Sequence, residues 1–176
     1  CAGESRRMNG ETIPSELPLN FAYTIKQPLG VVACVTPWNF PVAIPVWKIA
    51  PALVAGNTVV FKPASITPAT AVRITEIFEA AGIPAGVLNL VLGSGSEAGD
   101  EIINHQAVKA ISFTGSNGVG IRLYEQASRR GAKVPDGSPR RRLQGRRRRD
   151  ARRVLDLRVV ARAAYARTWR APARRG

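Results

Sequence analysis

Residues 31–63 read VVACVTPWNFPVAIPVWKIAPALVAGNTVVFKP, and two short apolar runs, Val31–Val35 and Thr58–Phe61, stand near the ends of this stretch. Each run is continuously apolar or β-branched and is soon followed by a proline, which is typical of a strand buried on both faces of a sheet. The segment between them, 42–55, has the length and apolar content of a helix, and Gly56-Asn57 ends it. A strand, a helix and a second strand are therefore predicted in succession.

The same alternation continues along the chain. Thr67 and Pro68 suit the N-cap and the first position of a second helix, and Gly82 suits the position just after its end. One stripe of that helix is expected to face the core: Thr70, Ile74, Ile77, Phe78 and Ala81. Two further strand–helix pairs are predicted at 87–91 with 97–104 and at 110–113 with 118–130. This order predicts an α/β fold with a doubly wound, Rossmann-like parallel sheet.

The first thirty residues are mostly polar and differ from the part that follows. Residues Phe21–Ile25 alternate in polarity, which favours a half-buried strand or one arm of a hairpin. We therefore divide the chain into an N-terminal segment (1–30), a cofactor-binding Rossmann-like domain (31–134) and an arginine-rich tail (135–176).

Charge separates the tail from the rest more sharply than any other property. The net charge is +14, but residues 1–134 hold 11 Lys and Arg against 9 Asp and Glu, whereas residues 135–176 hold 15 Arg, no Lys and 3 Asp. Such a tail could bind nucleic acid electrostatically. Arginine without lysine among Ala, Gly, Pro and Val is also what a GC-rich gene yields out of frame, and we favour that origin. We expect the tail to be disordered, because its apolar residues follow no strand or helix period.

The remaining composition sets broad limits. Apolar residues make up 45% of the chain, as in ordinary globular proteins, and no apolar run approaches the ~20 residues of a membrane span. No secretory signal is evident, so a cytoplasmic location without a membrane is expected. Cys34 lies inside a predicted buried strand and is interpreted as a core thiol, while Cys1 is terminal. His105 has no partners at metal or triad spacing, so we expect it at the surface and expect no metal site.

Four segments with candidate binding residues follow the predicted strands: TPWNFP (36–41), FKPAS (61–65), GSGSEAG (93–99) and FTGSNGVG (113–120). Ligands of doubly wound sheets bind beyond the carboxyl ends of the strands. Taken singly, each segment has a plainer interpretation: a rigid turn whose Asn caps a helix, a solvated strand-end Lys, a flexible turn, and a Ser that caps a helix. The last segment also predicts a helix N-terminus able to bind a pyrophosphate.

Together, in this order and spacing, the four segments resemble the aldehyde dehydrogenase superfamily, over roughly residues 7–134. With NGETIP at 9–14, the chain is most similar to bacterial semialdehyde dehydrogenases of the succinate-semialdehyde or 2,5-dioxovalerate type. The resemblance implies a cytoplasmic homo-oligomeric parent enzyme that oxidises a small-molecule aldehyde to a carboxylic acid with NAD or NADP.

The resemblance also implies roles for individual residues. The amide of Asn39 matches the family's oxyanion-hole donor, which makes it the one catalytic residue of this chain. Lys62 matches the lysine that binds the adenosine ribose, and Ser116 matches the serine that contacts the pyrophosphate. The implied cofactor-binding residues are Val35, Thr36, Trp38, Lys62, Pro63, Ala64, Ser65, Gly95, Gly99, Phe113, Thr114, Gly115 and Ser116.

Position 65 bears on the choice between the two cofactors. Family members restricted to NAD commonly carry Glu at the matching position, where its carboxylate repels a 2′-phosphate. Ser65 lacks that charge, so the resemblance implies that NADP is tolerated or preferred.

The resemblance ends before the segments that hold the family's thiolate nucleophile and its glutamate base, because PDGSPR (135–140) matches nothing in the family. We therefore expect a fragment that lacks these two residues and is inactive alone. A basic-tailed nucleic-acid-binding protein and a non-catalytic partner subunit of a full-length dehydrogenase are the alternatives.

Overall fold

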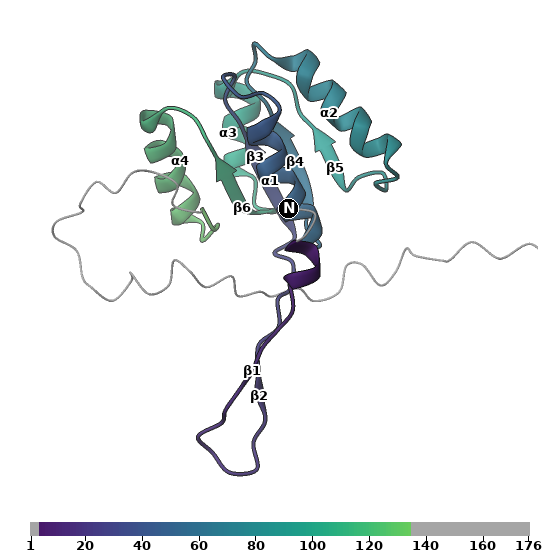
Figure 1. Ribbon diagram of the computed structural model, residues 1–176. Helices are drawn as coiled ribbons and strands as arrows, with labels where there is room; N and C mark the ends of the chain where they lie inside the picture. Colours follow the sequence, from purple (N-terminus) through teal and green to yellow (C-terminus); the bar gives the residue numbers. More distant parts are fainter. Residues whose placement is uncertain (1–3, 135–176) are drawn as a thin grey trace, which may run out of the picture.

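The computed structural model describes residues 4–134, and Cys1 and the arginine-rich segment 135–176 lie outside that range. Its elements in chain order are η1 (Glu4–Arg7), β1 (Thr12–Ile13), β2 (Ala22–Tyr23), β3 (Val31–Val35), α1 (Ala43–Val54), β4 (Thr58–Lys62), α2 (Pro68–Ala80), β5 (Leu88–Leu90), η2 (Gly95–Gly99, one π-helical turn), α3 (Asp100–Asn104), β6 (Val108–Phe113) and α4 (Asn117–Arg129). Figure 1 shows these elements. None of the helices in the described part is long and apolar enough to cross a membrane.

The core is a parallel sheet with the strand order β5-β4-β3-β6 (Figure 1). The chain first builds β3, β4 and β5 outward in one direction and then returns to add β6 on the other side of β3. This reversal is the doubly wound topology, so the predicted fold class is confirmed. The four predicted strands and four helices are all present, with ends that differ by a few residues.

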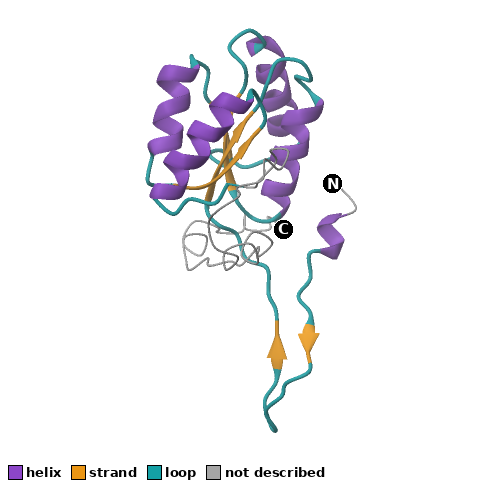
Figure 2. Cartoon of the chain, turned by 90° about the vertical axis from the view of Figure 1, so that its left-hand side faces the viewer, coloured by secondary structure: helices purple, strands orange, loops and turns teal. Residues whose placement is uncertain are grey.

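Helices cover both faces of the sheet (Figure 2). On one face α1 and α2 pack against a cluster centred on Ile49, Phe61 and Ile74. On the other face α3 and α4 pack against a cluster centred on Ile103 and Ile111, among others. Because successive side chains of a strand point to opposite faces, β3 and β4 contribute alternate residues to the two clusters.

The helix α2 begins as predicted, but its buried stripe differs from the prediction. Thr67 and Pro68 occupy the predicted positions, and Gly82 has a φ of +88°, which favours glycine after the helix end. Ile74 is buried as expected, but Ile77 is 56% exposed and Ala71 is buried in its place. Ala81 and Thr70 also lie outside the buried set. The core-facing stripe is therefore rotated toward Ala71, because the sheet contacts a narrower face of the helix than the apolar pattern suggests.

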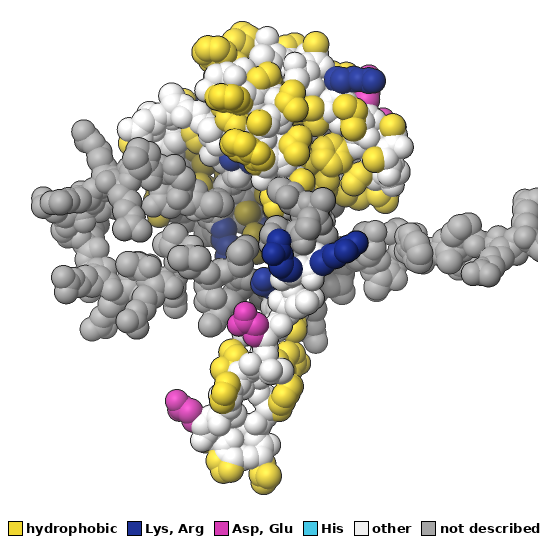
Figure 3. Space-filling model, viewed as in Figure 1, with side chains coloured by type: hydrophobic (Ala, Val, Ile, Leu, Met, Phe, Trp, Pro, Cys, Tyr) yellow, Lys and Arg dark blue, Asp and Glu magenta, His cyan; other side chains and the backbone are white. Residues whose placement is uncertain are grey.

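The N-terminal hairpin projects from the sheet (Figures 1 and 2). β1 and β2 pair antiparallel, with Thr12 opposite Tyr23, so the predicted hairpin arm is confirmed. The prediction that this strand is half-buried was wrong, since Phe21 and Tyr23 are 75% and 61% exposed; their rings form a tilted pair with centroids 5.7 Å apart. Hydrophobic side chains cover much of the hairpin in Figure 3. The division of the chain at residues 30 and 134 stays a prediction.

Asn57 joins the start of the sheet to the end of α1. Its side chain is buried; Oδ1 accepts from the backbone N–H groups of Leu29 (2.6 Å) and Gly30 (3.1 Å), and Nδ2 donates to the carbonyl of Ala52 (3.0 Å). We predict that Asn57→Ala lowers the free energy of unfolding by about 1 to 3 kcal/mol, since the partly buried backbone N–H groups of Leu29 and Gly30 lose their acceptor. Urea denaturation followed by circular dichroism measures this change. As a control, Asn104→Ala at an exposed position should change the free energy of unfolding by less than about 0.5 kcal/mol. An equally small effect of Asn57→Ala would show that the hydrogen bonds of Asn57 do not stabilise the fold.

Candidate functional site

Three parallel strands end side by side. In the register of the sheet Val35, the last residue of β3, pairs with Lys62 of β4 on one side and with Phe113 of β6 on the other. Val60 and Phe113 pack in the cluster beneath α3 and α4. Because side chains alternate along a strand, Lys62 points to the same face as Val60. The strand ends therefore present their last side chains toward α3 and α4.

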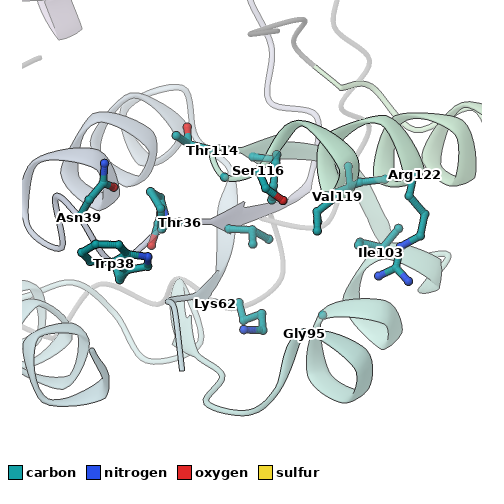
Figure 4. A pocket seen from close by; sticks show the side chains of 16 residues that line it. Thr36, Trp38, Asn39, Lys62, Gly95, Ile103, Thr114, Ser116, Val119 and Arg122 are labelled. Atoms are coloured by element: carbon teal, nitrogen blue, oxygen red, sulfur yellow. The ribbon is translucent and has the colours of Figure 1, made fainter. Parts of the chain in front are cut away.

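A cavity of about 550 Å³ lies at these strand ends, a volume typical of small-molecule and cofactor sites. Eleven of the fourteen predicted site residues line it: Val35, Thr36, Trp38, Asn39, Lys62, Gly95, Gly99, Phe113, Thr114, Gly115 and Ser116. Figure 4 shows that Trp38 and Asn39 lie at one end of the cavity and Val119, Ile103 and Arg122 at the other. The site is thus elongated, with Lys62 between the two ends.

The loops beyond the strands are held by backbone hydrogen bonds that continue the sheet. The N–H of Thr36 donates to the carbonyl of Lys62 (3.1 Å), and the N–H of Thr114 donates to the carbonyl of Val35 (3.1 Å). These bonds extend the parallel ladder by one residue past each strand. The positions of Thr36 and Thr114 are therefore set by the sheet.

Two polar groups of the cavity are buried at a cost. The side chain of Thr36 is only 4% exposed, and its hydroxyl has no hydrogen-bond partner in the described structure. Lys62 is 5% exposed, and its ammonium donates to the carbonyl of Pro63 (3.0 Å). Desolvation lowers the pKa of Lys62. Unpaired buried polar groups are uncommon in native proteins, and a ligand with acceptor oxygens would offset both costs.

Ser116 occupies the N-cap position of α4 without capping it through its side chain. Ser116 therefore occupies the capping position that the plainer interpretation predicted, but its side chain does not form the capping hydrogen bond. The free N–H groups of the first helical turn and the exposed hydroxyl are both available at the cavity. Asn39 likewise does not cap α1, whose N-cap is Val42.

Glycines keep the cavity open. A Cβ atom built at Gly99 would lie 3.6 Å from the Cε of Lys62, and one built at Gly95 would meet nothing within 4 Å. A Cβ at Gly115 would come within 2.5 Å of the Phe113 ring, so this glycine lets the ring lie against the loop. Any side chain at 99 would extend over Lys62.

Three predicted residues, Pro63, Ala64 and Ser65, do not line the cavity. Pro63 and Ala64 continue from Lys62 toward α2. The Ser65 hydroxyl donates to the carbonyl of Gly93 (2.9 Å), which ties the loop after β4 to the loop after β5. Ser65 therefore has a structural bond that the sequence did not reveal.

Five residues line the cavity that the sequence interpretation missed: Pro37, Ile103, Val119, Arg122 and Leu123. Three of them share one face of α4, because positions 119, 122 and 123 are spaced by three and four residues. The helical spacing of these three residues could have identified this face of α4, whereas motifs at strand ends do not include it.

The other face of the sheet carries a separate polar contact. Lys48 of α1 donates to the hydroxyl of Ser112 (2.9 Å), and its pKa is lowered by desolvation. Cys34 is fully buried, as predicted for a core thiol, and burial raises its pKa to about 12. His105 is exposed, as expected. Within residues 4–134 no group of three or more His, Cys, Asp or Glu side chains could hold a metal ion.

Comparison with known proteins agrees with this architecture. The chain is 54% identical over 119 residues to the 2,5-dioxopentanoate dehydrogenase of Saccharolobus solfataricus, which covers 68% of this chain and 25% of that protein. Since 2,5-dioxopentanoate is 2,5-dioxovalerate, the predicted type of relative is confirmed.

Solved structures show the same relationship. Betaine aldehyde dehydrogenase of Staphylococcus aureus, crystallised with NAD+, superposes with a TM-score of 0.73 at 41% identity and covers 76% of this chain and 26% of that chain. An NADP-dependent enzyme of E. coli superposes with a TM-score of 0.73 at 46% identity over 76% of this chain and 28% of that chain. The chain thus spans about a quarter of the length of the relatives it matches.

The family model for the aldehyde dehydrogenase family matches residues 1–135, about three quarters of the chain. This match contains the sheet, the helices on both its faces and every residue of the cavity. The chain belongs to the aldehyde dehydrogenase family.

Proposed function

We propose that the cavity at the strand ends binds NAD or NADP and that the whole protein uses it to oxidise an aldehyde to a carboxylic acid. One observation carries this proposal: the buried, unpartnered hydroxyl of Thr36 lines the same cavity as the desolvated ammonium of Lys62 and the free N-terminus of α4. All three favour an acceptor-rich, anionic ligand.

The residues fit such a cofactor. The α4 N-terminus and Ser116 would hold the pyrophosphate, since a helix N-terminus offers N–H groups and a positive dipole end. Lys62 would hold the adenosine ribose, and Gly95 and Gly99 would give the base and its ribose room. The remaining wall would come from the loops that contain Thr36 and Phe113, including Val35, Trp38, Thr114 and Gly115. The bound nicotinamide supplies a hydride acceptor.

Asn39 lies at the end of the cavity opposite Arg122 (Figure 4). We propose that its amide donates to the oxyanion that forms when a thiolate adds to the aldehyde carbonyl. If the backbone that carries an oxyanion-hole donor is already fixed, the donor does not need to reorganise when the oxyanion forms. The sheet fixes the backbone at Thr36, three residues before Asn39, through the bond to Lys62.

The relatives suggest the substrate class. The Saccharolobus relative is named for 2,5-dioxopentanoate, a semialdehyde with a carboxylate at its far end. We propose a semialdehyde for the whole protein as well, in a cytoplasmic homo-oligomer, as the sequence resemblance implies.

Pro63, Ala64 and Ser65 are proposed to act at the edge of the ribose site. Ser65 already donates to the Gly93 carbonyl, so its contribution to NADP use would be the absence of a carboxylate rather than a new hydrogen bond. The Phe61–Lys62 end of β4 directs this loop along the cavity edge.

The proposal predicts that the 176-residue chain binds NAD and that Gly99→Leu weakens this binding by more than tenfold. The new side chain would extend from a Cβ only 3.6 Å from Lys62 and fill the space proposed for the ribose. A titration followed by saturation-transfer NMR measures the Kd. Ala80→Leu in α2 is the matched control, because Ala80 is exposed and does not line the cavity. Absence of NAD and NADP binding to the unaltered, folded chain would refute the function.

A second prediction concerns the choice of cofactor. Ser65→Glu should raise the Kd for NADP at least tenfold more than the Kd for NAD, because it places a carboxylate beside the proposed 2′-phosphate position. Ser65→Ala is the control: it removes the bond to Gly93 without adding charge and should change both values alike. Equal effects of Ser65→Glu on the two cofactors would show that position 65 does not face the phosphate.

A third prediction is that the chain as printed oxidises no aldehyde. Its two cysteines are Cys1 and Cys34, and Cys34 is fully buried with a pKa of about 12, so it carries almost no thiolate near neutral pH. Aldehyde-dependent formation of NAD(P)H by the purified chain should stay at the background rate. Turnover that disappears in Cys34→Ala would identify Cys34 as a nucleophile and overturn this assignment.

A further inference from the structure

An ion pair lies at the end of the cavity farthest from Asn39. The Nη2 atom of Arg122 in α4 lies 2.8 Å from Oδ1 of Asp100 at the start of α3, and the two side chains are 50% and 29% exposed. Figure 4 shows Arg122 extending from α4 toward Ile103. The pair therefore connects the two helices that form this end of the cavity.

The surroundings of Arg122 are apolar and open. Ile103 and Leu123 are almost fully buried, Val119 lies one turn before Leu123, and all three line the cavity with Arg122. Gly95 and Gly99, in the turn that leads into α3, also line the cavity and contribute no side chain. This end of the cavity thus combines apolar side chains, bare backbone and one guanidinium, a lining that suits a flat, uncharged ring better than a phosphate.

The ion pair fixes how the guanidinium is presented. A guanidinium is planar and weakly hydrated, and it stacks on aromatic rings in a way that an ammonium cannot. Asp100 accepts a hydrogen bond from Nη2 at the edge of the guanidinium and leaves the two flat faces of the guanidinium uncovered. The described residues offer no aromatic ring that stacks on Arg122. Arg122 is thus held in place with its faces unused by the protein.

We propose that Arg122, oriented by Asp100, stacks on the purine base of the bound dinucleotide and is a binding residue for that half of the cofactor. This inference rests on the proposed function. It assigns a role to two residues that strand-end motifs do not include. The contribution would be specific to the base, because Lys62 and the α4 N-terminus, nearer the strand ends, are assigned the ribose and the phosphates.

The test compares ligands with and without the purine, on the full 176-residue chain. AMP carries the base, nicotinamide mononucleotide carries a phosphate and ribose but no purine, and NAD carries both halves. We expect Arg122→Leu to raise the Kd for AMP and for NAD about fivefold, which is the usual effect of losing one partly exposed stacking contact. The Kd for nicotinamide mononucleotide should stay unchanged. Arg122→Lys should behave like Arg122→Leu, since it keeps the charge and loses the plane. Asp100→Asn should have a smaller effect of the same kind.

Arg73→Leu is the matched control, because Arg73 forms a comparable ion pair with Glu76 (3.0 Å) on α2, outside the cavity. It should leave all three Kd values unchanged. Full affinity for AMP in Arg122→Lys would show that charge alone matters, and an equal loss for all three ligands in Arg122→Leu would show a purely structural bridge; either result overturns the inference. If Arg122→Leu binds AMP as tightly as the unaltered chain does, the inference about Arg122 is wrong. The proposed function still stands in that case, provided that the unaltered chain binds NAD. If the unaltered chain binds neither AMP nor NAD, the proposed function itself fails and the inference with it.

Discussion

The parallel register of β4, β3 and β6 is the constraint from which the site follows. Pairing of Val35 with Lys62 and with Phe113 brings three strand ends to one edge, although the residues lie far apart in sequence. A shift of one residue in either pairing would turn the last side chain of that strand to the opposite face. The two bonds beyond the ladder, from Thr36 to Lys62 and from Thr114 to Val35, carry the same register into the loops. The cavity is therefore a consequence of sheet geometry more than of loop conformation.

The polar residues at this edge reduce the stability of the fold. Thr36 keeps a buried hydroxyl without a partner, and Lys62 keeps a cation whose pKa is lowered by desolvation. An apolar residue at either position would avoid this cost. Under the proposed function, a bound anion would supply acceptors for both groups, so that the free energy lost in folding would return as affinity. The apolar clusters beneath the four helices supply the stability that allows this arrangement.

Most of the sheet and of the cavity lining could be predicted from sequence, for reasons visible in particular residues. The continuous apolar runs of β3 and β4 identify strands buried on both faces, and their ends identify Thr36 and Lys62. What could not be predicted depends on contacts between elements. Ser65 donates to Gly93, in a loop that follows a different strand. Periodicity puts Arg122 on one face of α4, but the sequence does not show that this face meets Asp100 of α3. The buried face of α2 likewise depends on how the helix lies on the sheet.

The alternation of side chains also explains why the buried thiol of Cys34 has no part in the site. Cys34 precedes Val35 by one residue and Asn39 by five, which places it near the cavity along the chain. Its side chain nevertheless belongs to the cluster beneath α1 and α2, whereas Val35 lines the cavity on the other face. There it is fully buried, and the nearby charge of Lys48 lowers its pKa by less than burial raises it. A thiol only one residue from the site is thus separated from it by the full thickness of the sheet. Under the proposed function, the nucleophile that meets an aldehyde beside Asn39 would therefore not be Cys34.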